Sequence, residues 1–252
     1  MVIQQSFIFL DKIGRKSELN IRQQGINSWD DFLNADKISG ISPLRKAYYD
    51  RRIRQALQAL GQEDYLYFVD KLPQKEMWRL YPEVKEGCGY LDLEIDANGT
   101  VILLGISDYY HTNFFVKGFN LERHLIEKEL SKYRAIITFN GSSFDLPKLR
   151  RMGIKLKLVH IDLKPLCVNL GLVGGLKEIE KTLNLKRPTN LYGNPVDLWR
   201  SFHASGDKEY LDLLIEYNRE DVENLKLVME HVYKKMKENL GRSTDKAKRI
   251  KN

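Results

Sequence analysis

Long apolar stretches are missing from this sequence. No run approaches the roughly 18 to 20 consecutive apolar residues that a membrane-spanning helix needs. Residues 1–9 also lack the basic start and long apolar run of a secretory signal peptide. Both absences argue against a membrane protein or an exported one, and we expect a globular protein in the cytoplasm.

Cysteine is scarce as well, with Cys88 and Cys167 as the two examples. They are too few and too widely spaced for a disulfide framework or a metal cluster, so we expect two reduced, largely buried thiols. The sequence also has no Gly-x-x-x-x-Gly-Lys-Ser/Thr loop, which argues against a nucleotide-driven motor.

The composition is that of a globular protein with a basic surface. Of 252 residues, 42% are hydrophobic and 30% charged, which suffices for one large domain or two modest ones. The formal net charge of +7 is compatible with a polyanionic partner, because clustered Lys and Arg bind phosphates by releasing counterions. Charge alone does not identify that partner.

Residues 1–84 are predicted to form a small all-helical domain. Ser28 is expected to cap a short helix with acidic residues in its first turn, where the helix dipole favours them. Ser42 and Pro43 are expected to begin a longer helix that ends near Leu60.

Two stretches of this domain, 10–18 and 25–32, resemble a degenerate helix-hairpin-helix. In that motif a glycine-containing turn lets backbone N–H groups approach a nucleic-acid phosphate. Gly14 stands where the family has two glycines. The alternative is a helical cap that packs on the second domain.

Residues 85–240 have the pattern of an α/β domain. Strands are expected at 89–96, 101–107, 113–117, 135–139 and 157–161, and helices at 121–133, from 144, at 176–183 and at 208–240. Three antiparallel strands followed by strand, helix, strand and helices resemble a ribonuclease-H-like fold, a mixed sheet flanked by helices. The basic residues 241–252 are expected to be a disordered tail.

The first of these strands carries acidic residues on alternate positions. Asp92, Glu94 and Asp96 would share one face, because successive side chains of a strand point to opposite sides. Three carboxylates on one face repel each other unless solvent, basic side chains or bound cations lie among them. The alternative to a cation site is an edge strand with a solvated acidic face.

Two more positions are candidates for a shared site. Asp145 follows a polar loop after a strand, where α/β folds place ligands, although an Asp at a helix start is commonly a cap. Tyr217 and Asp221 lie four residues apart on a predicted helix and hence on one face. Neither observation identifies a site alone.

Taken together, the motifs resemble the DEDD exonuclease superfamily, in the subgroup with Tyr in its third motif, and its YprB-like branch of ribonuclease-H-like predicted exonucleases. The similarity rests on Leu-Asp-Leu-Glu, Thr-Phe-Asn-Gly-x-x-Phe-Asp-Leu-Pro, His-Ile-Asp-Leu, Gly-Leu-Lys-x-Ile-Glu and Tyr-Asn-x-x-Asp-Val, and spans roughly residues 87–235.

This resemblance implies a catalytic site of five residues with two divalent cations, Mg²⁺ or Mn²⁺. The metal ligands it implies are Asp92, Glu94, Asp145 and Asp221, and it implies that Tyr217 orients the attacking water. Two cations about 4 Å apart stabilise the attacking and leaving oxygens of phosphodiester hydrolysis. A phenol of pKa about 10 is a poor base, so Tyr217 itself is not expected to deprotonate the water.

Three further residues have weaker roles. Asn140 is expected to steer its loop or to touch a terminal nucleotide, and His160 to hold substrate. The alternative for His160 is a buried, hydrogen-bonded side chain, with Asp162 capping the next helix. Arg219 lies inside the third motif, where it would either reach a phosphate or lie on a solvated helix face.

The leading hypothesis is a metal-dependent 3′–5′ exonuclease that acts on ends of single-stranded DNA or RNA. The alternatives are an endonuclease or structure-specific nuclease with the same site, and a nucleic-acid-binding module with a silent site. The sequence does not choose between ribose and deoxyribose.

Overall fold

The computed structural model describes residues 1–108, 110–187 and 194–249, with residues 242–249 described by their backbone alone. The chain folds as two compact units, Met1–Val84 together with the chain from Tyr233, and Lys85–Val232. Across the described ranges, no helix is both long and apolar enough to cross a membrane. We retain the domain limits 1–84, 85–240 and 241–252 as a proposal.

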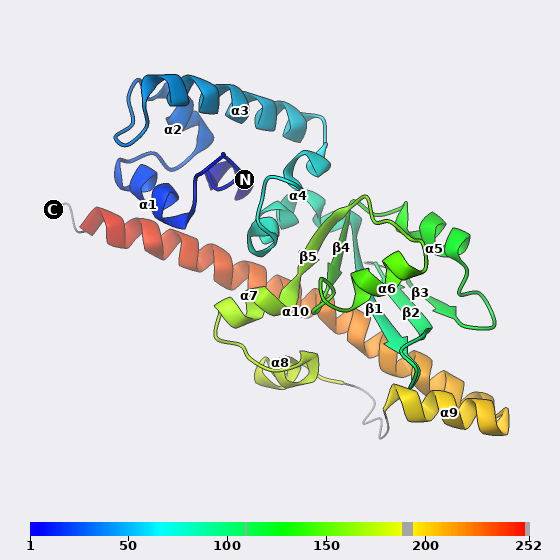
Figure 1. The fold of residues 1–252 in the computed structure, drawn as a ribbon. Coiled ribbons are helices and arrows are strands. Elements are labelled where there is room, and N and C mark those ends of the chain that lie inside the picture. Colours follow the sequence, from blue (N-terminus) through cyan, green and yellow to red (C-terminus); the bar gives the residue numbers. More distant parts are fainter. Residues whose placement is uncertain (109, 188–193, 250–252) are drawn as a thin grey trace. The chain divides into compact units, whose positions relative to one another are not determined.

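The first unit is helical (Figure 1). It contains α1 (Arg15–Gln23), α2 (Trp29–Asn34), α3 (Pro43–Gly61) and α4 (Tyr81–Val84), with 3-10 turns at Ile3–Gln5, Tyr65–Phe68 and Gln74–Leu80. The predicted caps are confirmed: Ser28 accepts the N–H of Asp31 in a capping box, and Ser42 accepts the N–H of Arg45 ahead of α3.

Aromatic side chains fill the core of this unit. The fully buried rings belong to Phe7, Trp29, Phe32, Tyr49, Phe68, Trp78 and Tyr81. Gly14 precedes α1 in an extended conformation, and its neighbour Arg15 pairs with Glu76 at 3.0 Å. Phosphate binding at Gly14 stays a prediction.

The second unit is built on a five-stranded mixed sheet of order β3-β2-β1-β4-β5 (Figure 1). Its elements are a 3-10 turn at Lys85–Gly87, β1 (Cys88–Ile95), β2 (Val101–Ser107), β3 (Thr112–Val116), α5 (Arg123–Leu130), β4 (Ala135–Thr138), α6 (Asp145–Arg151), β5 (Val159–Asp162), α7 (Leu163–Asn169), α8 (Leu176–Thr182), α9 (Pro195–Ser205) and α10 (Lys208–Arg249). Strands β1, β2 and β3 pair antiparallel, and β4 pairs parallel with β1 and β5. The predicted ribonuclease-H-like α/β fold is confirmed.

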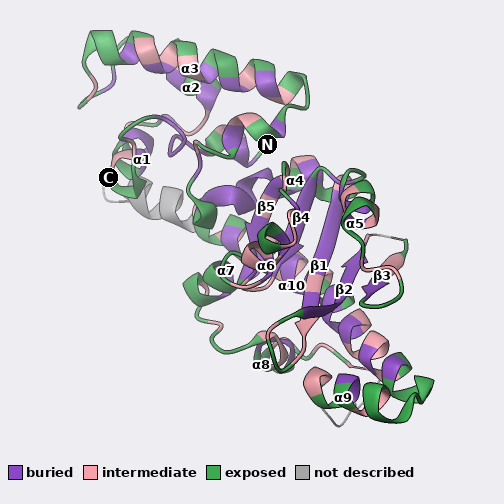
Figure 2. Ribbon diagram, turned by 45° about the vertical axis from the view of Figure 1, so that its right-hand side comes forward, coloured by how far each residue is buried: buried purple, intermediate pink, exposed green. Residues whose placement is uncertain are grey.

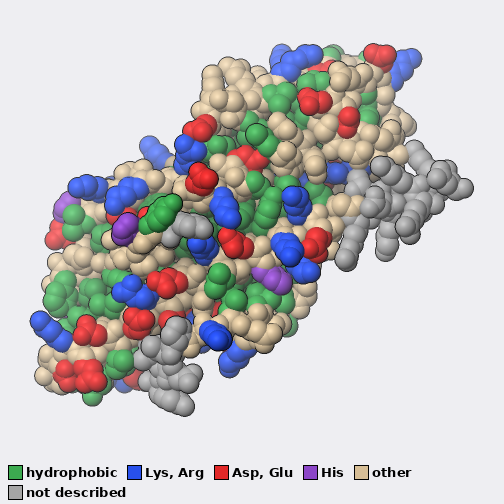
Figure 3. All heavy atoms as spheres, turned by 180° about the vertical axis from the view of Figure 1, so that it is seen from behind, with side chains coloured by type: hydrophobic (Ala, Val, Ile, Leu, Met, Phe, Trp, Pro, Cys, Tyr) green, Lys and Arg blue, Asp and Glu red, His purple; other side chains and the backbone are tan. Residues whose placement is uncertain are grey.

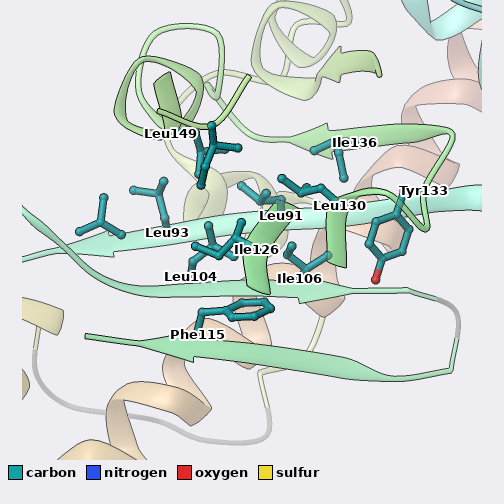
Figure 4. Packing of buried hydrophobic residues seen from close by; sticks show 12 residues of the cluster. Leu91, Leu93, Leu104, Ile106, Phe115, Ile126, Leu130, Tyr133, Ile136 and Leu149 are labelled. Carbon is teal, nitrogen blue, oxygen red and sulfur yellow. The ribbon is translucent and has the colours of Figure 1, made fainter. Parts of the chain in front are cut away.

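Helices cover both faces of the sheet. On one face Leu91 and Leu93 of β1 pack with Ile126 and Leu130 of α5 and Leu149 of α6 (Figure 4). On the other face, Leu103 and Val116 pack with side chains of α9 and α10. The central strands are accordingly buried (Figure 2). Because β1 has one face in an apolar core, its acidic residues must lie on the side of α10.

Two helices differ from the sequence-based expectation. Helix α9 was not predicted separately, although Asn194 accepts the N–H of Asp197, Pro195 stands at its first position and Gly206 ends it in a left-handed conformation. Helix α10 continues past its expected end near Leu240 to Arg249. The expected tail therefore begins no earlier than residue 250, outside the described residues.

The remaining general expectations concern thiols and charge. Cys88 and Cys167 are free and buried, as predicted, and burial raises the pKa of each thiol to about 12. On the face drawn in Figure 3, Lys and Arg side chains lie among Asp and Glu side chains. The positive net charge is therefore dispersed over that face.

Candidate active site

An acidic pair projects from the central strand of the sheet. Asp92 and Glu94 are half-buried on β1, on the face opposite Leu91 and Leu93. Parallel pairing of β1 with β4 ends at Tyr90, so the acidic pair lies beyond the hydrogen-bonded part of β4. The sheet thus opens on that side of β1, at the carboxyl end of β4, where α/β folds place ligands.

Asp221 of α10 completes a cluster with this pair. One carboxylate oxygen from each of Asp92, Glu94 and Asp221 lies within 4.8 Å of the other two. Burial, followed by the charges of Glu94, Asp221 and Asp145, raises the pKa of Asp92 well above its usual value. Burial and the charge of Asp221 raise the pKa of Glu94 to about 8.

Asp145, the first residue of α6, approaches the cluster from the third element. It is 2% exposed, and its Oδ1 is buried without a hydrogen-bond partner among the described residues. Burial raises its pKa to about 7, which the backbone N–H of Leu93 partly offsets. Asp145 lies outside the three-carboxylate cluster, but its charge contributes to the raised pKa of Asp92 and of Glu94.

This donor set fits a divalent cation. Carboxylate oxygens are the hard ligands that Mg²⁺ and Mn²⁺ prefer. The mutual repulsion within the cluster and the unpaired buried oxygen of Asp145 both indicate a deficit of positive charge. Asp92, Glu94 and Asp221 could bind one ion directly, with Asp145 as a further ligand.

Tyr217 lies one helical turn before Asp221 on α10 and is half-buried. Burial, followed by the charges of Asp221 and Glu94, raises the pKa of its phenol. The Lys177 ammonium lies 4.0 Å from the centre of the ring. Tyr217 therefore remains protonated at neutral pH and can donate a hydrogen bond.

The sequence analysis missed the role of Asn218. This side chain is fully buried and donates a hydrogen bond of 2.9 Å from Nδ2 to Oδ2 of Asp92. It packs on Gly105 of β2, where an added Cβ would lie 2.0 Å from Oδ1 of Asn218. Gly105 is the β2 residue paired with Asp92. The position of Asn218 inside the third motif was the signal that could have revealed it.

Arg187 was missed as well. Its guanidinium pairs with Glu180 at 2.6 Å and with Glu220 at 3.5 Å, and also contacts Oδ1 of Asp221. Burial raises the pKa of Asp221 to about 6 even though Arg187 acts to lower it. Arg187 follows α8 in a loop without periodicity, so no local pattern pointed to it.

Asn140 and His160 lie outside the three-carboxylate cluster. Asn140 has a left-handed φ of 64° and donates its backbone N–H to Asp162 at 2.8 Å. His160 lies 2.9 Å, from Nε2, from the hydroxyl of Thr138, and burial lowers its pKa to about 4. The expected cap by Asp162 is present, since it accepts the N–H of Lys164. These contacts give both residues local structural partners, and their substrate role stays a prediction.

Two charged neighbours have local partners too. Asp96 accepts N–H groups of Asn98 and Thr100 in the hairpin turn, which lower its pKa against the opposing effect of slight burial. Arg219 pairs with Glu216 at 3.0 Å and lies 4.8 Å from the ring centre of Phe114.

Comparison with known proteins identifies the domain that carries this site. The family model of the RNase H superfamily matches residues 89–233. The chain belongs to the RNase H superfamily. The match includes β1, Asp145 and the part of α10 with Tyr217 and Asp221. A comparison with curated proteins gave no match.

Membership in the RNase H superfamily agrees with the chemistry of the cluster. It indicates a nuclease-type domain with a nucleic-acid substrate, and nucleases of this fold usually use divalent metals. The acidic cluster lies within the matched segment.

Proposed function

We propose that the chain is a metal-dependent 3′–5′ exonuclease of the Tyr-type DEDD group, similar to its YprB-like branch, which hydrolyses single-stranded DNA or RNA. In this proposal Asp92, Glu94, Asp145 and Asp221 hold two Mg²⁺ or Mn²⁺ ions, and Tyr217 orients the attacking water. Bound divalent ions would activate the water and stabilise charge on the scissile phosphate.

One observation carries the proposal: three carboxylates from β1 and α10 converge to within 4.8 Å inside a superfamily of nucleases. Burying like charges this closely costs stability unless a cation is bound, so a purely structural role would not favour it. The buried, unpaired Oδ1 of Asp145 adds to that argument.

The neighbouring residues prepare these carboxylates for binding. Asn218 fixes one oxygen of Asp92, and the contact from Arg187 favours the ionised form of Asp221. The protonated phenol of Tyr217 donates a hydrogen bond and does not accept the proton of the water. Its role is therefore orientation.

The experiment is digestion of single-stranded DNA and RNA, each labelled at the 5′ end or at the 3′ end, with Mg²⁺ or Mn²⁺. Asp92→Asn is compared with Asp96→Asn, a matched control on the same strand face whose carboxylate serves the hairpin turn. We expect a ladder of 5′-labelled products that shortens from the 3′ end. Asp92→Asn should lower the rate by more than about 100-fold, since even indirect neighbours of metal ligands cost 10- to 100-fold.

Other outcomes would replace the proposal. Discrete internal cuts would indicate an endonuclease or a structure-specific nuclease. Binding of nucleic acid without cleavage of any substrate would indicate a silent binding module. Equal loss of activity in Asp96→Asn and Asp92→Asn would contradict the assignment of the metal ligands.

A further inference from the structure

A pocket of about 800 Å³ lies in the first unit, beside the beginning of α3. Its walls come from the turn at Asp11 and Lys12 and from residues 42–51 (α3 in Figure 1). All of these residues belong to the Met1–Val84 segment. The volume is within the roughly 300 to 1,000 Å³ of typical ligand sites. None of its residues belongs to the proposed active site.

The pocket carries an excess of positive charge. Lys12, Arg45 and Arg51 line it, and none of the three forms an ion pair with another described residue. The acidic lining residue is Asp11, whose carboxylate accepts a hydrogen bond from the Tyr48 hydroxyl. The first turn of α3 has no acidic residue to offset the helix dipole. An anion is the complementary ligand.

The same pocket offers an aromatic and aliphatic surface. Leu44 is 85% exposed, and the Tyr48 ring has the Arg51 guanidinium 5.8 Å from its centre. Hydrogen bonds to Asp11 from the hydroxyls of Tyr48 and Tyr49 hold both rings in place. A held aromatic ring among cations is the combination by which proteins stack a nucleobase and bind its phosphates.

We propose that this pocket binds a segment of single-stranded nucleic acid, with a base against Tyr48 and Leu44 and the flanking phosphates at Lys12, Arg45 and Arg51. Inorganic phosphate would leave the apolar wall unused, and an apolar ligand would leave three cations without a partner. The three cations lie along two segments of the pocket wall, which suits consecutive phosphates of a strand. This site goes beyond the proposed hydrolysis, because binding here requires neither metal nor cleavage.

The test is the affinity of the full chain for labelled single-stranded oligonucleotides, measured by fluorescence anisotropy in EDTA so that no cleavage occurs. Arg51→Glu is compared with Arg54→Glu, an exposed position on the same helix outside the pocket that makes the same change in net charge. We expect Arg51→Glu to weaken binding by about tenfold or more at low salt, and to reduce the salt dependence by about 0.7 per lost phosphate contact. Arg54→Glu should change the dissociation constant by about twofold at most, as expected of a charge outside the site.

A second pair of variants tests the aromatic wall. Tyr48→Ala should weaken binding by about 5- to 100-fold, the range for loss of one stacked base. Tyr48→Phe keeps the ring and should bind within about twofold of the wild type. Circular dichroism melting of each variant shows whether it is folded, and the comparison at Arg51 and Arg54 decides the matter if Tyr48→Ala is not.

Three results would overturn this proposal: equal weakening by Arg51→Glu and Arg54→Glu, equal affinity of Tyr48→Ala and Tyr48→Phe, or a mononucleotide that binds as tightly as the oligonucleotide. The first indicates diffuse attraction, the second excludes stacking and the third indicates a pocket for free nucleotides. Asp92→Asn should retain the effect of Arg51→Glu on binding. Failure of the nuclease proposal is therefore distinguishable from failure of this one.

Discussion

Asn218 on α10 and Asp92 on β1, 126 residues apart in the chain, are joined by a hydrogen bond of 2.9 Å. Asn218 has no exposed surface, so the bond is shielded from water. It restrains the central carboxylate of the cluster and connects the helix that carries Asp221 to the strand that carries Asp92.

Asn218→Ala is therefore expected to lower cleavage by about 10- to 100-fold, the usual effect of removing a group that orients a metal ligand. The matched control is Asn224→Ala, which removes another buried amide of α10, one whose Nδ2 has no hydrogen-bond partner among the described residues. Steady-state cleavage rates at saturating Mn²⁺ provide the measurement. Equal rates for both variants would contradict a positioning role for Asn218.

Gly105→Ala should reach the same site from β2. Its new Cβ would lie 2.0 Å from Oδ1 of Asn218, so that side chain must move. We expect a loss of about 1 to 3 kcal/mol in the free energy of unfolding, as for other overpacked cores, together with reduced cleavage. Gly61→Ala, at the end of α3 with open space around it, is the control and should be neutral or slightly stabilising. Urea unfolding measures both, and unchanged cleavage by Gly105→Ala would contradict the contact.

Arg187→Gln should destabilise the fold, because it leaves the buried carboxylates of Glu180 and Glu220 unpaired. Removing one partner of a buried ion pair typically costs about 3 to 5 kcal/mol. The control Arg200→Gln breaks an exposed pair with Asp197 and should cost less than about 1 kcal/mol. If urea unfolding gives equal values for the two variants, Arg187 is not the residue that holds these carboxylates.

The pH dependence of stability should reverse when metal is added. The folded-state pKa values of Asp221, Asp145 and Glu94 are raised to about 6, 7 and 8, above their ordinary values of 3.8, 3.8 and 4.5. The stability that these groups contribute in their protonated form is full below their unfolded pKa values, and it is lost as pH rises through the folded ones. In EDTA the cluster should therefore lower Tm between about pH 5 and 8.

Mn²⁺ should raise Tm more at pH 8 than at pH 5, because metal ligands must be deprotonated. Glu94→Gln removes one titrating group and should flatten the profile in EDTA. A Tm increase by Mn²⁺ that is equal at both pH values, or that persists in Glu94→Gln, would contradict metal binding by the cluster.

Local patterns in the sequence were sufficient to predict the framework of the site. The alternation in β1 places Asp92 and Glu94 on one face, and the four-residue spacing places Tyr217 and Asp221 on one face of α10. Both patterns depend only on backbone geometry. The predicted strands consequently match the observed ones to within a few residues.

The sequence could not reveal contacts that depend on tertiary structure. Arg187 lies in a loop, and its pairing with Asp221 depends on how α8 lies against α10. The fit of Asn218 over Gly105 likewise requires the packing of α10 on β2. The pocket beside α3 joins the Asp11 turn to Tyr48, residues that no motif connects.

The most direct test of the central claim is hydrolysis of a single-stranded oligonucleotide by metal-free protein to which Mn²⁺ or Mg²⁺ is added back. We predict no cleavage in EDTA, recovery with either ion, and no recovery in Asp221→Asn at any ion concentration at which that variant remains folded. Cleavage by the wild type in EDTA, or by Asp221→Asn at the wild-type rate, would contradict the conclusion that the acidic cluster of β1 and α10 is a metal-dependent nuclease site.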